Sequence, residues 1–336
     1  MKPHLDMQVT EQSQVGEARR AALRLCLMHD LDETARGRIA LLVTELGTNL
    51  ARHARAGRLL MACLAGADGV HFEILSIDSG PGMADVSRCL RDGFSTGSTP
   101  GTGFGAVRRG STDFSVFSVV DKGTVILSRV WFPNPAAPLP VRPPSPLMHA
   151  GICLAAPGET VSGDAWELQV SGDRARLAMA DGLGHGPVAA EASEVAMTVF
   201  RQSTGSPAAV LEQAHPAMRS TRGAAMAVAS IDAAAGTLDF AGAGNISGRI
   251  ISAVEDCSLM SQHGTVGVQI RKIQDMAYAW PRHALVVLHS DGLTSRWKLD
   301  HVPGLFQCDP AVVAGWLIRE HTRGQDDVTV LIVKRS

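Results

Sequence analysis

The chain of 336 residues contains no block of Lys or Arg, and its formal net charge is only −2. Nucleic-acid and membrane-surface binding need a concentrated positive patch, so we expect neither partner. No apolar run approaches the roughly 20 residues of a membrane helix. Residues 1–12 are polar and lack the apolar core of a signal peptide. These absences predict a soluble cytoplasmic protein.

The six cysteines are far apart, and none forms a C-x-x-C pair. This spacing indicates neither a zinc knuckle nor a disulfide framework, so we interpret the thiols as small buried side chains in a reducing compartment. Hydrophobic residues make up 45% of the chain and charged residues 19%. That balance allows a full core in each of two domains and argues against disorder.

Proline is concentrated in one place. Residues 133–146 read PNPAAPLPVRPPSP and contain 7 of the 17 prolines. Such a segment cannot sustain a helix or an inner strand, and it favours a semi-rigid polyproline II spacer. We therefore predict a domain over 1–132, a linker over 133–146 and a second domain over 147–336.

The periodicity of apolar residues predicts a mixture of helices and short strands in both halves. Without a strict alternation of strand and helix, both domains are expected to be layered α+β folds. In the first half the predicted elements are helices over 16–28, 33–54 and 85–91, a strand over 70–77 and two strands within 114–130. In the second half they are strands over 151–155, 166–170, 175–180, 224–231, 237–241, 284–288 and 328–333, and helices over 187–202 and 311–321.

The helix predicted over 33–54 carries the string Glu45-Leu46-Gly47-Thr48-Asn49. Glu45 and Asn49 are four residues apart, so their side chains lie on one face of the helix. A carboxylate can deprotonate an attacking hydroxyl group, and a carboxamide oxygen is a suitable hard ligand for Mg²⁺. Taken alone, the same pair could equally be solvated on a helix surface.

Two glycine-rich strings follow this helix. Asp78-Ser79-Gly80-Pro81-Gly82 comes directly after a predicted strand, where its glycines would let the backbone approach a flat ligand, although a tight turn would have the same sequence. Gly101-Thr102-Gly103-Phe104-Gly105-Ala106 precedes a helical stretch, so its amide groups could face phosphate. The second string also fits G-x-G-x-x-A, but a dinucleotide fold needs a strand directly before the glycines, and loop residues precede them here.

The order of these three motifs, followed by Gly123-Thr124, resembles the Bergerat ATP-binding fold of the GHKL superfamily. Within it, the chain is similar to the switch serine kinases of anti-sigma and stressosome systems, over about residues 15–132. Asp92-Gly93-Phe94-Ser95-Thr96 and Arg129-Val130-Trp131 add to this likeness. The resemblance implies a sandwich with helices on one face of a mixed sheet, ATP and Mg²⁺ as cofactors, and a Ser/Thr kinase activity.

The resemblance also implies residue roles. Asn49 would hold Mg²⁺ and Glu45 would be the catalytic base. Asp78 would accept a hydrogen bond from the adenine amino group, and Thr124 would lie near the adenine. Gly80 and Gly82 would approach the base, whereas Gly101, Gly103 and Gly105 would wrap the phosphates.

In the second half, aspartate stands beside glycine at four separated places. These are Ser162-Gly163-Asp164, Ala180-Asp181-Gly182, Ser290-Asp291-Gly292 and Gly324-Gln325-Asp326-Asp327. Carboxylates that converge on one sheet edge repel one another unless cations lie between them, and all-oxygen ligands favour Mg²⁺ or Mn²⁺. Any single Asp-Gly pair could be a hairpin turn, but four at strand ends favour a two-metal site that hydrolyses phosphate esters.

This pattern resembles the metal-dependent PPM (type 2C) phosphatases of the bacterial sporulation and stress branch, over about residues 151–334. The resemblance implies an αββα sandwich and two Mn²⁺ or Mg²⁺ ions. Asp164 and Asp181 would bind one ion, and Asp181 would bridge to the other as the key catalytic ligand. The remaining ligands of the second ion would be the Gly182 carbonyl, Asp291 and Asp326. The region between residues 241 and 280 is short, which predicts a minimal phosphatase without a long flap.

Together the two resemblances predict a partner-switching regulator that phosphorylates and dephosphorylates a STAS-domain protein. A sigma factor or another signalling protein would be a further partner, in a stress response. Two alternatives remain. In one, the first half is a non-catalytic ATP-sensing or partner-binding module that gates the phosphatase, because its glycine-rich string has no lysine and the nearest cations are Arg108 and Arg109. In the other, the chain is a non-catalytic adaptor that sequesters its partner.

Overall fold

The structure, a computed structural model, describes residues 3–66, 69–89, 103–134 and 146–336. The chain divides into two compact units, one within residues 4–142 and one formed by residues 143–336 with 1–3. The division falls inside the proline-rich segment, of which residues 135–145 lie outside the described residues. Among the described helices, none is both long enough and apolar enough to cross a bilayer.

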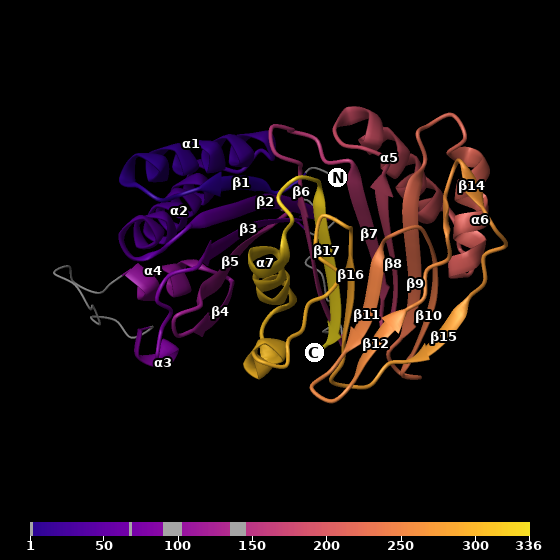
Figure 1. Ribbon diagram of the computed structural model, residues 1–336. Coiled ribbons are helices and arrows are strands. Elements are labelled where there is room, and N and C mark those ends of the chain that lie inside the picture. The colour runs from indigo at the N-terminus through magenta and orange to yellow at the C-terminus, as the bar shows by residue number, and fades with distance from the viewer. Residues whose placement is uncertain (1–2, 67–68, 90–102, 135–145) are drawn as a thin grey trace. The chain divides into compact units, whose positions relative to one another are not determined.

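The N-terminal unit is a five-stranded sheet with two long helices over it (Figure 1). Its strands follow the order β1-β2-β3-β5-β4, and every neighbouring pair is antiparallel. The expectation of a mixed sheet is therefore wrong, because β5 returns between β3 and β4 and runs opposite to both. The elements are β1 (Leu5–Gln8), α1 (Gln12–Met28), α2 (Glu33–His53), β2 (Arg58–Gly66), β3 (Gly69–Asp78), α3 (Val86–Cys89), α4 (Gly103–Gly110), β4 (Asp113–Val119) and β5 (Gly123–Pro133).

Helix α2 joins the core of this unit to its candidate site. The side chain of Asp32 caps the helix by accepting a hydrogen bond from the Ala35 amide at 2.7 Å. Ile39, Leu42 and Leu46 are fully buried and pack with the apolar face of the sheet, as their spacing predicts. The same packing fixes the rotation of α2, and thereby the direction of its polar residues.

The C-terminal unit has two five-stranded sheets packed face to face, with helices outside, which is the expected αββα sandwich (Figure 1). One sheet has the order β15-β10-β9-β8-β7 and is covered by α5 and α6; the other has the order β12-β11-β16-β17-β6 and is covered by α7. The elements are β6 (Leu147–Leu154), β7 (Asp164–Ser171), β8 (Arg174–Gly182), α5 (Pro187–Gln202), α6 (Pro207–Ala217), β9 (Ala224–Asp232), β10 (Thr237–Ala243), β11 (Ser247–Ile251), β12 (Asp256–Leu259), β13 (Gly264–Thr265), β14 (Gln269–Ile270), β15 (Met276–Ala279), β16 (Leu285–His289), α7 (Pro310–His321) and β17 (Val328–Arg335).

Alternation along the inner strands explains how these layers form. In β8, Leu177 and Met179 belong to the core between the two sheets, whereas Ala178 and Ala180 belong to the core under the helices. Small residues on the helix side let α5 approach the sheet closely. Both faces of β8 are buried, so the strand is held firmly up to the aspartate near its end.

Several elements of the structure were not predicted. The region between residues 241 and 280 was described from the sequence only as too short for a long flap. In the structure it contributes five strands, β11 to β15. Strands β1 and β2 and helix α6 were also missed. Strand β12 lies at the edge of its sheet and β15 at the edge of the other, so this region extends both sheets.

Candidate active sites

The candidate nucleotide site lies around the second half of α2. Glu45 and Asn49 are both partly buried on this helix. The Asn49 side-chain amide nitrogen is buried without a hydrogen-bond partner. A buried polar group without a partner is costly, so this amide fits a position that a polar ligand completes. The neighbouring Leu46 and Leu50 are in the core, which fixes the direction of both polar side chains.

Strands β3 and β5 bring the aspartate motif beside Thr124. Asp78 and Thr124 are directly opposite in the antiparallel pairing. One oxygen of Asp78 accepts a hydrogen bond from the Gly80 amide at 2.7 Å, and the Thr124 hydroxyl lies 2.9 Å from that of Ser118. The Ser79 amide donates to the Arg55 carbonyl just after α2, at 2.9 Å. The structure therefore brings the end of α2, the D-x-G-x-G turn and Thr124 together.

Gly82 needs to be glycine for two reasons. Its φ angle is +68°, in the left-handed region that side chains avoid. A Cβ atom there would also lie 2.2 Å from the Val119 carbonyl oxygen. The turn is thus pressed against the β4–β5 hairpin, leaving its backbone close to any ligand above it.

The glycine-rich string lies only partly within the described residues. Gly101 is outside them, whereas Gly103 and Gly105 are in the first turn of α4. The expectation that these glycines precede the helix is therefore wrong for the last two, because helical geometry begins at Gly103. Amide groups in the first turn of a helix lack intrahelical acceptors, so they can still face an anion.

The candidate phosphatase site collects aspartates from both sheets of the sandwich. Asp164 and Asp181 are directly opposite in the pairing of β7 with β8. Asp291 follows β16, and Asp326 precedes β17, which is the neighbour of β16 in the other sheet. The charges of Asp164, Asp291, Asp326 and Asp327 all act on Asp181, so the four separated motifs meet in space.

The electrostatics of this cluster are those of crowded carboxylates. Burial, followed by the neighbouring aspartates, raises the pKa of Asp181. Burial also raises the pKa of Asp164, although the hydroxyl groups of Ser290 and Thr329 oppose the shift. Neither carboxylate oxygen of Asp164 meets hydrogen-bond geometry with a partner, and the residue is 4% exposed. A cation would satisfy these oxygens and relieve the repulsion, so the residues fit a bound divalent ion.

The carboxylates of the cluster come from separate strand ends and loops. Within the described part of the chain, no three His, Cys, Asp or Glu side chains stand in a ready metal-ligating group. The oxygen-only chemistry of the aspartates matches Mg²⁺ or Mn²⁺ rather than a metal that prefers sulfur or imidazole.

Asp327 has a structural task distinct from that of its neighbour Asp326. Its two carboxylate oxygens accept hydrogen bonds from the amides of Ala156 at 2.8 Å and Gly163 at 2.9 Å. The start of β17 is thereby tied to the loop that precedes Asp164. Asp326 is exposed and accepts a hydrogen bond from the Asp327 amide at 2.9 Å.

Two supporting contacts of this site were missed from the sequence. The Asn245 side-chain amide donates to Asp291 at 2.7 Å, across 46 positions of the chain. His289 is buried; its Nδ1 donates to the Ser290 carbonyl at 2.8 Å, and its Nε2 accepts from the Trp297 indole at 3.1 Å. Burial lowers the pKa of His289 to about 4, so its imidazole is neutral and has one defined tautomer. The sequence signals were weak: His289 is the last residue of an apolar strand, and Asn245 lies just before one.

Comparisons with known proteins divide the chain in the same way. Residues 9–129 match the family model of the histidine kinase-like ATPase domain, and residues 171–336 match that of Stage II sporulation protein E, SpoIIE. The serine/threonine-protein kinase RsbT of Bacillus subtilis (strain 168) is 33% identical over 94 residues, which are 28% of this chain and 71% of that protein.

Solved structures are also similar to this chain. One, described as "The bacterial stressosome: a modular system that has been adapted to control secondary messenger signaling", is 26% identical, with a TM-score of 0.52, and spans 56% of this chain and 99% of its own. Another, RsbX in complex with magnesium, is 20% identical, with a TM-score of 0.49, and spans 56% of this chain and 96% of its own.

Proposed function

Because the chain belongs to the histidine kinase-like ATPases of RsbT type and ends in a SpoIIE phosphatase domain of the PP2C type, we propose that it both phosphorylates and dephosphorylates a STAS-domain partner. The kinase domain would comprise residues 1–132 and the phosphatase domain residues 147–336. The convergence of four separated Asp-Gly motifs on Asp181 is the observation that carries the phosphatase half of this proposal.

In the phosphatase half, Asp164, Asp181, Asp291, Asp326 and the Gly182 carbonyl would hold two Mn²⁺ or Mg²⁺ ions. Such ions neutralise charge on phosphoryl oxygens and lower the pKa of water at the site. The protein's own contribution is orientation. Asn245 directs Asp291 by its hydrogen bond, and Asp327 fixes the loop before Asp164.

In the kinase half, Asn49 would hold the Mg²⁺ that accompanies ATP, and this ion would balance the charge of the phosphates. The Asp78 carboxylate would accept a hydrogen bond from the adenine amino group, beside Thr124. The Glu45 carboxylate would take the proton from the serine or threonine hydroxyl as that oxygen attacks. Gly103 and Gly105 would present amide groups from the first turn of α4.

The test uses the full chain, Mg²⁺ or Mn²⁺, and the STAS-domain protein encoded nearest to it. With ATP we expect phosphoserine or phosphothreonine to form on that protein, and Glu45→Ala to abolish it. A partner phosphorylated in advance should lose its phosphate, and Asp181→Asn should prevent this. If the wild-type chain neither adds nor removes the phosphate, the proposal is wrong.

A second candidate function is a phosphatase that the N-terminal domain gates by sensing ATP. The observation that favours it is the absence of lysine from the glycine-rich string, where Arg108 and Arg109 are the nearest cations. On this alternative, Glu45→Ala and Asn49→Ala would change the phosphatase rate, and no partner phosphorylation would be found in any variant. Partner phosphorylation by the wild type, lost in Glu45→Ala, would exclude it.

A further inference from the structure

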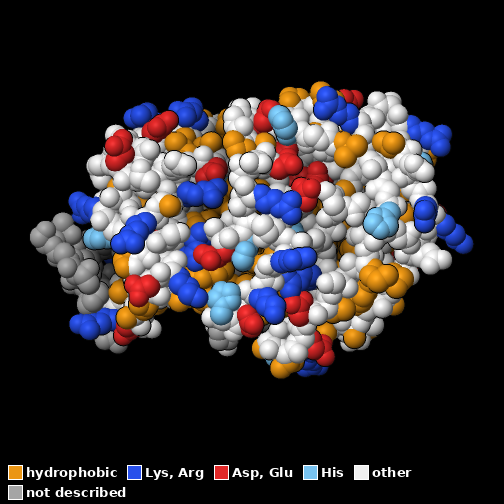
Figure 2. All heavy atoms as spheres, viewed as in Figure 1, with side chains coloured by type: hydrophobic (Ala, Val, Ile, Leu, Met, Phe, Trp, Pro, Cys, Tyr) orange, Lys and Arg blue, Asp and Glu red, His pale blue; other side chains and the backbone are white. Residues whose placement is uncertain are grey.

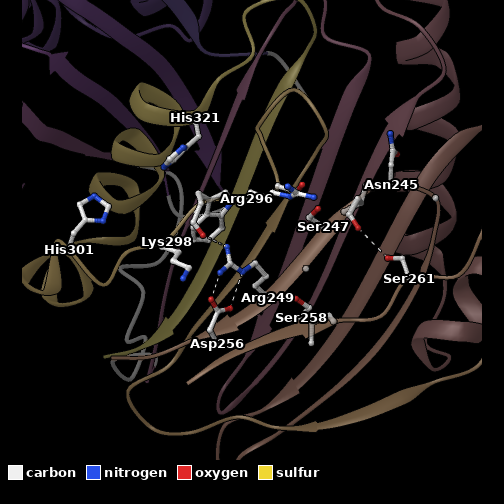
Figure 3. Close-up of a pocket in the computed structure, with 16 residues that line it drawn as sticks. Asn245, Ser247, Arg249, Asp256, Ser258, Ser261, Arg296, Lys298, His301 and His321 are labelled. Atoms are coloured by element: carbon white, nitrogen blue, oxygen red, sulfur yellow. Dashed lines mark hydrogen bonds and ion pairs between the residues drawn. The ribbon is translucent and has the colours of Figure 1, made fainter. Parts of the chain in front are cut away.

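The C-terminal unit has a cavity of about 820 Å³ that the sequence did not indicate. It is lined by the strands β11 and β12 and by the loop that follows Asp291 (Figure 3). Asn245 belongs to its lining and also donates the hydrogen bond to Asp291. The cavity therefore begins at the candidate phosphatase site and leads away from it.

The lining of the cavity is basic. Arg249 is neutralised, because it pairs with Asp256 and donates to the Trp297 carbonyl at 2.9 Å. Arg296 and Lys298 lie on either side of Trp297, are exposed, and have no hydrogen bond or ion pair recorded among the described residues. Figure 2 shows Lys and Arg side chains, with Asp and Glu side chains between them, on the face where Figure 1 places β16 and β17.

Two histidines and their acidic neighbours complete the charge balance. His301 lines the cavity and lies 3.6 Å from the carboxylate of Asp300. His321 also lines the cavity and interacts electrostatically with the neighbouring Glu320. The Glu320 carboxylate is itself paired with Arg319. Among the described residues that line the cavity, Arg296 and Lys298 are then the cations that have no acid paired with them, so the cavity favours negative charge.

The loop that carries these cations is held rigidly. Trp297 is 2% exposed; its indole donates to His289, and the Arg249 guanidinium lies 3.9 Å from the centre of its ring. The Thr294 amide donates to the His321 carbonyl at 2.9 Å, and the Arg323 amide donates to the Gly292 carbonyl at 2.8 Å. Burial of Trp297 leaves its two neighbours directed outward, so the charges are positioned before any ligand arrives.

The part of the lining that β12 contributes suits a polypeptide. Strand β12 is an edge strand, so one side of its backbone is not paired within the sheet. Its residues Asp256 and Ser258 line the cavity and are exposed. An extended peptide could add to such an edge by main-chain hydrogen bonds, whereas a small anion would leave it unused.

We propose that this cavity binds an acidic segment of the phosphorylated protein, next to the phosphorylated residue. The proposal rests on the phosphatase function proposed above and adds the chemistry by which the substrate is selected. Arg296 and Lys298 pair with Asp or Glu side chains of the segment, and β12 pairs with its backbone. The phosphorylated residue then lies toward Asn245 and the aspartate cluster.

The test measures binding to the full chain by the fluorescence anisotropy of a labelled hexaglutamate peptide without phosphate, with hexaglutamine for comparison. We expect the wild type to bind hexaglutamate and to bind hexaglutamine at least tenfold more weakly. Arg296→Glu with Lys298→Glu should weaken hexaglutamate binding about tenfold, because two exposed ion pairs are lost. The neutral pair Arg296→Gln with Lys298→Gln should give a smaller loss in the same direction.

The matched control is Arg271→Glu with Lys272→Glu, which makes the same charge change on exposed residues outside the cavity lining. It should alter binding by less than twofold. Equal effects of the two charge reversals, or no preference of the wild type for hexaglutamate, would overturn the proposal. Hydrolysis of p-nitrophenyl phosphate with Mn²⁺ is measured in parallel: its absence in the wild type would refute the phosphatase function, whereas the binding result stands or fails by itself.

Discussion

At the scale of single residues, Asp181 is the position on which the candidate phosphatase site converges. Its partner across the strand pair is Asp164, and the charges of three further aspartates reach it. Asp181 could be predicted from the local sequence, because it forms an Asp-Gly pair at the end of an apolar strand. Asn245 gave no such signal, since its contact with Asp291 depends on a fold that brings distant residues together.

We expect Asp181→Asn to reduce Mn²⁺-dependent hydrolysis of p-nitrophenyl phosphate about a thousandfold, because the proposed central ligand of the ions is removed and several kcal/mol of charge stabilisation are lost. Steady-state rates at several Mn²⁺ concentrations measure the effect. Asp173→Asn, at an exposed aspartate in the turn between β7 and β8, is the control and should leave the rate unchanged. Retained turnover in Asp181→Asn would refute the proposed ligand set.

Glu73 gives a prediction about pH and stability. It is buried, and burial alone would raise its pKa, but its hydrogen bond to His4 and the charge of Arg129 lower the pKa from 4.5 to about 2. As pH falls below 4.5 the unfolded chain binds a proton first, so stability is lost down to about pH 2. We expect the N-terminal unit to lose about 3 kcal/mol of unfolding free energy over this range.

Urea unfolding of the full chain at pH 5, 4, 3 and 2 measures this loss. Glu73→Gln should already be destabilised at pH 5 and should show a weaker pH dependence than the wild type. Glu17→Gln, at an exposed position of α1, should behave like the wild type. An unchanged pH dependence in Glu73→Gln would show that another group is responsible.

At the scale of elements, local patterns were predictable and distant pairings were not. Helix α2 was found because its buried residues follow one helical face. Strands β12 to β15 have only two to four residues each, which is too short for a period to be recognised. Strand β15 is defined by pairing with β10, 42 positions earlier at Thr237↔Ala279. The basic cavity was missed for the same reason.

The cap of α2 should influence the nucleotide site, because this helix carries Glu45 and Asn49. Asp32→Ala removes the acceptor for the Ala35 amide and should destabilise the N-terminal unit by about 1 kcal/mol. Asp32→Asn keeps a capping oxygen and should cost much less. Urea unfolding compares the three proteins, and equal stability of the Ala and Asn variants would contradict this role of the cap.

At the scale of the whole molecule, the division into two compact units predicts two separate responses to ligands. In differential scanning calorimetry of the full chain, Mg-ATP at about 100 times its Kd should raise one unfolding transition by about 10 °C. Mn²⁺ should raise the temperature of the other unfolding transition. Asn49→Ala should cancel only the ATP effect, and Asp181→Asn only the Mn²⁺ effect. A single transition that both ligands shift together would contradict independent sites.

The presence of both units on one chain also fixes their stoichiometry. Every molecule that is synthesised carries one of each, so gene expression and degradation cannot change their ratio. Two opposing enzymes on separate proteins could be balanced through their abundance; under the function proposed above, that control is absent here. Under that function, a shift of the partner between its phosphorylated and free forms would have to come from the supply of nucleotide and divalent ions, or from a signal that acts on one unit alone.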